Sequence, residues 1–144
     1  MGRRTLVVVP QSDGRYDCRV AHWGVDGDPI AQSRPLGTGW SASTVGATLD
    51  ARYEAVVVCD GRVQRYCVCW LDPTLRDADD VAVARTDDPE SFRAWWVVRK
   101  SRAADAVARG VDPQVVRDDL RAALDARADA WYWPDDAPFL RADG

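Results

Sequence analysis

The sequence predicts an α+β fold, with an antiparallel sheet of about five strands (two β-hairpins plus a short strand) and two C-terminal helices packed on one face. Two runs of β-branched residues are each followed by an Asp-Gly turn and a second run, which is the pattern of a β-hairpin. Later in the chain, two Asp-Pro pairs each begin a stretch with helical spacing. The 144 residues are enough for one domain with a single hydrophobic core.

The first hairpin is predicted from residues 4–10, which form an apolar strand, and residues 15–23, which return after the turn at Asp13-Gly14. Because successive strand residues point to opposite faces, one face of the returning strand can be assigned. We expect that face to be buried, and it carries Tyr16, Cys18, Val20 and His22.

Residues 24–40 are rich in glycine and proline and predict a long loop. Ser41 or Ser43 is a suitable N-cap for a short helix that ends near Leu49. The second hairpin follows, with strands over 52–59 and 62–71 joined at Asp60-Gly61.

The valines of the second hairpin favour a strand that is buried on both faces, and therefore central in the sheet. Residues 73–80 read as an acidic loop, and Val81 to Arg85 as a short fifth strand.

Asp88-Pro89-Glu90 predicts the start of a long helix, because an N-cap, a first-turn proline and a first-turn carboxylate follow one another. We expect this helix to reach Arg109 and to end at Gly110. A second helix begins at Asp112-Pro113. Its buried stripe is predicted to contain Val116, Leu120, Leu124, Ala128 and Trp131. Residues 1–134 then form a single α+β domain, and residues 135–144 a loosely held tail.

Composition restricts the chemistry that this chain can perform. One histidine, His22, and one lysine, Lys100, leave few groups for acid–base catalysis near neutral pH. The four cysteines, Cys18, Cys59, Cys67 and Cys69, match no zinc-binding spacing and lie in predicted strands, where cysteine usually packs as a small apolar residue. We therefore expect no catalytic residue, metal or other cofactor, and an enzyme is less favoured than a binding protein.

The acidic residues point to a salt-rich environment. Aspartate occurs 21 times and glutamate twice, and short carboxylates keep a surface hydrated in concentrated salt. No apolar run approaches the ~20 residues of a membrane helix, and the N-terminus has no export signal, so we expect a cytoplasmic protein without a membrane partner. A halophilic archaeon or its virus is the expected source, and a high-GC actinobacterium or its phage is the alternative.

The segment 92–102 combines three aromatic residues with four basic ones and contains no acid. Its aromatic residues either pack on the sheet, with the basic side chains solvated, or form an interaction surface. Likewise, His22-Trp23 at the end of a strand is either structural or part of a site. The candidate binding residues are His22, Trp23, Trp95, Trp96, Arg99, Lys100 and Arg102.

Three functions remain open. The first is a non-enzymatic interaction or regulatory module that binds a protein partner or itself through exposed aromatics, because seven tryptophans accompany few catalytic side chains. The second is nucleic-acid binding through residues 92–102. The third is a small enzyme built on His22.

The N-terminal stretch carries a resemblance. Met1-Gly2-Arg3-Arg4, Asp13-Gly14-Arg15-Tyr16 and His22-Trp23-Gly24 are similar to the pattern MGxR…DGxY…HWG of a group of small haloarchaeal proteins of unknown function, in which serine stands at the position of Ala21. The resemblance covers about the first 30 residues. It implies a haloarchaeal source and implies no activity.

Overall fold

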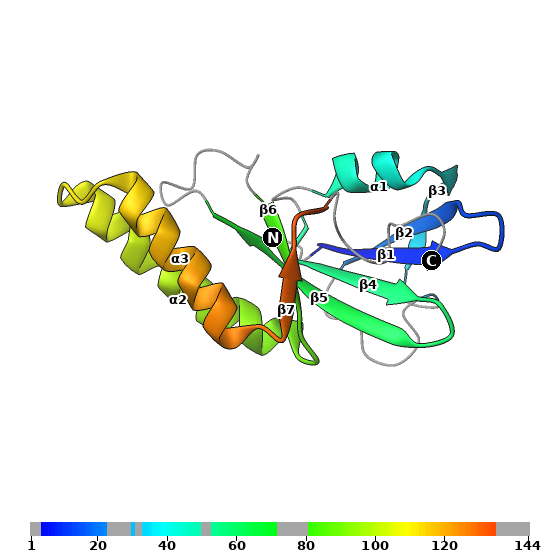
Figure 1. Cartoon of the computed structure of the whole chain (residues 1–144). Helices are drawn as coiled ribbons and strands as arrows, with labels where there is room; N and C mark the ends of the chain where they lie inside the picture. The colour runs from blue at the N-terminus through cyan, green and yellow to red at the C-terminus, as the bar shows by residue number, and fades with distance from the viewer. Residues whose placement is uncertain (1–3, 23–29, 31–32, 50–52, 72–80, 135–144) are drawn as a thin grey trace.

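The computed structural model describes residues 4–22, 30, 33–49, 53–71 and 81–134. They form one seven-stranded mixed sheet, with a short helix on one face and a pair of long helices on the other (Figure 1). The α+β class is confirmed. The strands lie in the order β3-β2-β1-β4-β5-β6-β7.

The N-terminal part is a three-stranded meander rather than a hairpin and a loop. β1 (Arg4–Pro10) and β2 (Tyr16–His22) pair as predicted, and β3 (Arg34–Trp40) adds to β2. The prediction of a loop through residue 40 was wrong, because backbone pairing with β2 overrides the poor strand propensity of Pro35 and Gly37. The pairing is irregular, and β3 is the exposed edge of the sheet, where such residues are tolerated.

A crossover connection links this meander to the second hairpin. α1 (Ala42–Thr48) begins at Ser41, whose hydroxyl accepts a hydrogen bond from the Thr44 N–H. β4 (Ala55–Cys59) then runs parallel to β1. The sheet is therefore not purely antiparallel as predicted. Parallel neighbours require a crossover, and α1 supplies it.

The remaining strands complete the other half of the sheet. β4 pairs with β5 (Val63–Trp70), and β5 pairs with β6 (Val81–Arg85), as the sequence predicts. All three valines of β4 are buried, which confirms that this strand is central. β7 (Ala130–Tyr132) adds to β6 as a seventh strand where a helix was predicted to continue to Trp131.

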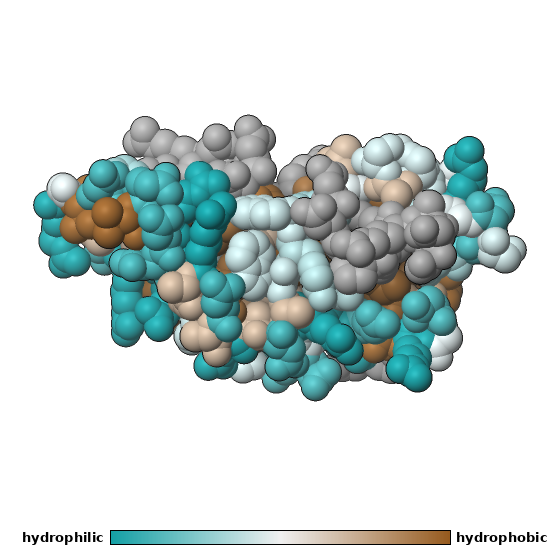
Figure 2. Space-filling view, in the orientation of Figure 1, coloured by the Kyte–Doolittle hydropathy of each residue, from teal (hydrophilic) through white to brown (hydrophobic). Residues whose placement is uncertain are grey.

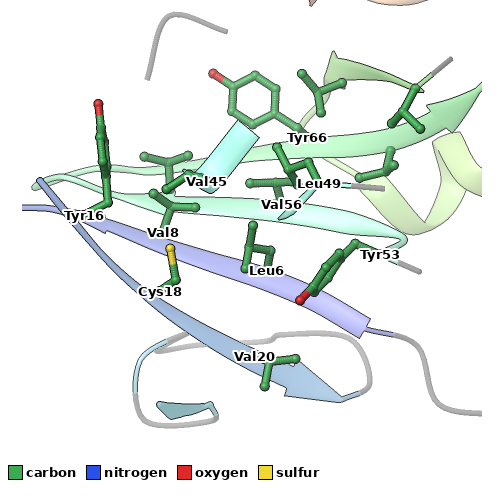
Figure 3. Packing of buried hydrophobic residues seen from close by; sticks show 14 residues of the cluster. Leu6, Val8, Tyr16, Cys18, Val20, Val45, Leu49, Tyr53, Val56 and Tyr66 are labelled. Atoms are coloured by element: carbon green, nitrogen blue, oxygen red, sulfur yellow. The ribbon is translucent and has the colours of Figure 1, made fainter. Parts of the chain in front are cut away.

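Alternate side chains of the sheet contribute to two separate hydrophobic cores. Leu6, Val8, Cys18 and Val56 pack on one face beneath Val45 of α1 (Figure 3). On β5, Tyr66 and Val68 belong to this core, whereas Cys67 and Cys69 face the opposite core under α2. The two C-terminal helices pack on one face of the sheet as predicted, and α1 covers the other face.

α2 (Pro89–Ala108) and α3 (Pro113–Arg127) form a helical hairpin that extends beyond the sheet (Figure 1). Both begin as predicted, at the N-caps Asp88 and Asp112. α2 ends in a Schellman arrangement, in which Val111 N–H donates to Ala106 O and Gly110 N–H to Val107 O. Gly110 has a φ of 98°, which only glycine adopts without strain.

The face of α2 toward the sheet carries Phe92, Trp96 and Ala103, and α3 closes the core with Val116, Leu120 and Leu124. An ion pair of 3.1 Å between Arg93 Nη2 and Glu54 Oε1 also ties α2 to the segment before β4. No helix in the described ranges is long and apolar enough to cross a membrane. The predicted acidic loop over 73–80 and the tail over 135–144 lie outside the described residues.

Candidate functional site

The predicted basic-aromatic segment lies on α2, and the helix distributes its side chains around the full circle. With about 100° between successive residues, no single surface can carry all of them. Trp96 and Lys100 point into the core, with exposed fractions of 0% and 2%. Burial removes these two predicted binding residues from any contact surface. Arg99 and Arg102 are exposed, and Trp95 is half-buried.

Trp95 lies at the boundary between core and solvent, where α2 meets the end of α3. The guanidinium carbons of Arg99 and Arg127 lie 5.7 and 5.0 Å from its ring centroid. Its ring also makes an edge contact with Phe92, with 5.3 Å between centroids. Each cation–π contact contributes about 0.5–1 kcal/mol at such exposure, so the ring is held in place by protein groups.

Two further residues carry a similar contact at the other flank of α3. Arg121 lies over the ring of Trp133 at 5.2 Å, and Trp131 packs edge-on against Trp133. The indole N–H of Trp131 donates a 2.7 Å hydrogen bond to Asp125 Oδ1. No local sequence signal predicts these partners of Arg121 and Arg127. Arginines of α3 meet these rings only because the two helices are antiparallel and β7 folds back.

The buried side of α2 places a lysine and two thiols near one another. Lys100 Nζ lies 5.9 Å from the ring centroid of Trp70. Cys67 and Cys69 project from β5 toward the same core, with 3.9 Å between their sulfur atoms. Burial and the hydrogen bond from Cys69 to Cys67 raise the pKa of the Cys69 thiol well above its usual value, although Lys100 acts in the opposite direction. A neutral buried thiol is a poor nucleophile.

The other two cysteines do not join this pair. Cys18 faces the core under α1, and burial together with Asp17 raises the pKa of Cys18 from 9.0 to about 12. Cys59 is half-buried at the end of β4. None of the four cysteines, all of which are described, forms a disulfide. Within the described ranges, no three His, Cys, Asp or Glu side chains lie close enough to hold a metal ion.

His22 ends β2 and is exposed, unlike Tyr16, Cys18 and Val20 on the same strand face. The core under α1 ends before this position, so the prediction of burial was wrong for His22 alone. Its Nε2 lies 3.4 Å from Nη2 of Arg34, which can only donate. Trp23 lies outside the described residues.

His22 and the thiol pair are far apart. Ala21, the neighbour of His22, is in register with Thr5, Ala55 and then Cys67 on the next three strands. Three strand spacings separate Ala21 from Cys67 by about 14 Å. The geometry therefore does not bring the histidine together with the Cys67–Cys69 pair.

Exposed apolar side chains gather on the helical hairpin. Of the seven large apolar residues exposed in the described part of the chain, four lie there: Val97, Val98, Val111 and Val115. Figure 2 shows hydrophobic atoms at the end of the hairpin, over the turn between α2 and α3. These valines were not among the predicted binding residues, although Val97 and Val98 directly follow Trp96 in the sequence.

No protein-family model, curated protein or solved structure matches this chain significantly. The candidate site is therefore defined by its geometry alone: the helical hairpin, with its exposed valines and its half-buried tryptophan–arginine contacts.

Proposed function

We propose that this protein is a non-enzymatic interaction module that binds a protein partner or a second copy of itself through the α2–α3 hairpin. The observation that carries the proposal is the exposure of Val97 and Val98, at 41% and 50%, on a helix that already buries its opposite side. A helix with apolar residues on both sides normally has a neighbour on each.

The half-buried tryptophans support the same proposal, with aromatic rings that are partly exposed. Of the six described tryptophans, Trp96 is fully buried and the other five are half-buried, so five rings are partly exposed. Half-buried Trp95 beside Arg99 and Arg127 is the combination that is enriched in protein interfaces. The exposed valines would supply the apolar centre of the contact, and the half-buried tryptophan rings would lie at its border.

We place this module in the cytoplasm of a halophilic archaeon or its virus, on the strength of the aspartate-rich composition. In molar salt the Debye length falls to about 3 Å, so apolar contacts would contribute more to binding than exposed charges. The valine surface suits such conditions.

Site-specific photo-cross-linking in the native cells tests the proposal. A photoreactive amino acid at Val98 is expected to give discrete cross-linked species, whereas the same amino acid at Val63, which is 43% exposed on β5, is expected to give none of them. The absence of cross-links from position 98, or identical products from both positions, would refute the proposal.

Nucleic-acid binding is the second candidate, and one observation favours it: the exposed Arg99 and Arg127 lie over the ring of Trp95, and Arg102 is exposed further along α2. Fluorescence anisotropy with single-stranded DNA and RNA tests it at low and at molar salt. Binding that Arg99→Ala and Arg102→Ala weaken, with a reduced salt dependence, would support this candidate. No binding at either salt concentration would exclude it.

A further inference from the structure

The side of α2 that faces away from the sheet is lined by small and apolar residues. Six exposed positions share this side, mostly at spacings of three and four residues. Val97 and Val98 lie near the middle of the helix and form the apolar centre of this side. The other four positions, toward the two ends of the helix, are small or polar. We call this set the outer face of α2, and it consists of Ala94, Val97, Val98, Ser101, Asp105 and Ala108.

Opposite charges stand at the two ends of the outer face. Glu90 is exposed in the first turn of α2, and Arg109 is exposed at its C-cap. They are 19 positions apart, or about 28 Å along a helix. A second α2 laid antiparallel, centred between Val98 and Ser101, brings each Glu90 opposite Arg109 of the second copy. Parallel packing would instead oppose like charges.

The same antiparallel register suits the side chains between the ends. It places Val98 opposite Ser101 and Ala94 opposite Asp105, so no two like charges are directly opposed. It also places Val97 opposite Arg102, whose aliphatic stem can cover a valine while the guanidinium stays in water. Small residues at the contact allow helix axes to approach to about 8 Å.

We propose that two copies of this chain pair through the outer faces of α2, antiparallel around a two-fold axis. This inference rests on the proposed function and names its partner. Because a two-fold interface uses the same surface on both copies, the assembly closes at a dimer.

The size of the contact sets the expected affinity. A strip about 30 Å long and 10 Å wide buries roughly 300 Å² on each copy, or about 600 Å² in total. Stable interfaces bury at least about 1,200 Å², so this dimer belongs among weak, reversible contacts. We expect a dissociation constant on the order of 100 µM, which corresponds to an association free energy of about −5.5 kcal/mol.

The exposed side of α3 offers a different pairing, because Asp118, Asp119 and Asp125 are exposed there and Arg99 and Arg102 are exposed on α2. A contact in which α2 of each copy meets α3 of the other can also close at two. The charge exchange between Glu90 and Arg109 distinguishes it from the proposed pairing, because pairing through the outer faces brings these two residues together.

Analytical ultracentrifugation of the full chain from 5 to 500 µM, at low and at molar potassium chloride, tests the proposal. A monomer–dimer equilibrium is expected, and Val98→Asp is expected to raise its dissociation constant at least tenfold. The matched control is Val63→Asp, which places the same charge at a 43% exposed valine of β5, outside the helical hairpin, and should change the constant less than twofold. Circular dichroism verifies that both variants stay folded.

Charge exchange at low salt tests the register. Glu90→Arg and Arg109→Glu should each weaken self-association, because each opposes like charges twice in the dimer. Mixed one to one, they should form a heterodimer with near wild-type affinity. Any of four results would overturn the proposal. The wild-type chain could stay monomeric at 500 µM in both salts, or it could grow beyond a dimer. The two aspartate variants could have equal effects, or mixing the charge variants could fail to restore self-association.

The two proposals fail in distinguishable ways. If the purified chain stays monomeric while a cross-linker at Val98 captures a different polypeptide in cells, self-pairing is refuted and the interaction function stands. If position 98 captures nothing and the chain is monomeric, both are refuted.

Discussion

Replacing Trp96 tests the description of the core under α2. This side chain is fully buried between the sheet and the helical hairpin, and its indole N–H has no hydrogen-bond acceptor among the residues that the structure describes. Trp96→Ala removes the whole ring, whereas Trp96→Phe keeps a six-membered ring and removes the N–H. The two variants therefore separate the packing contribution of the ring from the cost of its buried donor.

The expected magnitudes follow from burial. Truncating a fully buried aromatic side chain to alanine costs about 3–5 kcal/mol of unfolding free energy. For 144 residues, with about 2.1 cal/mol/K per residue, the melting temperature should fall by roughly 10–16 °C. In Trp96→Phe the smaller ring loses contacts, but about 1–3 kcal/mol of desolvation cost disappears with the N–H. The net change should stay within about 1.5 kcal/mol.

Urea denaturation followed by circular dichroism measures both variants. Val98→Ala, at a half-exposed position on the same helix, is the control and should change the unfolding free energy by less than about 0.5 kcal/mol. If Trp96→Phe costs as much as Trp96→Ala, the indole N–H contributes a stabilising bond, and the reasoning about its missing acceptor is refuted.

Three further predictions concern the sheet. Folding raises the pKa of Cys18 from 9.0 to about 12, so the unfolded chain binds fewer protons than the folded one above pH 9. The unfolding free energy should therefore fall with rising pH by up to about 1.4 kcal/mol per pH unit. Urea titrations at pH 8 to 10 should show a shallower fall for Cys18→Ala. A thiol reagent should modify half-buried Cys59 first and buried Cys18 only at the rate of unfolding, and mass spectrometry distinguishes the two sites. Equal modification rates would contradict the burial of Cys18. Gly37→Ala should lower the unfolding free energy by about 1–3 kcal/mol, because its Cβ would overlap the indole ring of Trp40. The loss should shrink in a Trp40→Ala background, and an equal loss there would disprove that contact as the cause.

Local sequence signals predicted most helix and strand boundaries well. β1 and β6 have the predicted bounds, and both long helices start at the predicted Asp-Pro pairs. These features depend on nearest neighbours along the chain: an N-cap bonds to residues two or three positions ahead, and an Asp-Gly turn joins adjacent strands. The candidate site was predicted in part. The segment 92–102 does carry exposed arginines, but Trp96 and Lys100 are buried and His22 lies elsewhere.

What the sequence by itself determined is the α+β class, the central valine strand and the placement of the long helices, because hydrophobic spacing and capping residues act locally. Only the tertiary structure decided the rest. The pairing of β3 and β7, the parallel contact of β1 with β4, and the side of α2 that stays exposed all depend on contacts between distant segments. A helix that is apolar on both sides has no preferred side in its sequence, and the sheet selects the one that is buried. That selection leaves Val97 and Val98 outside.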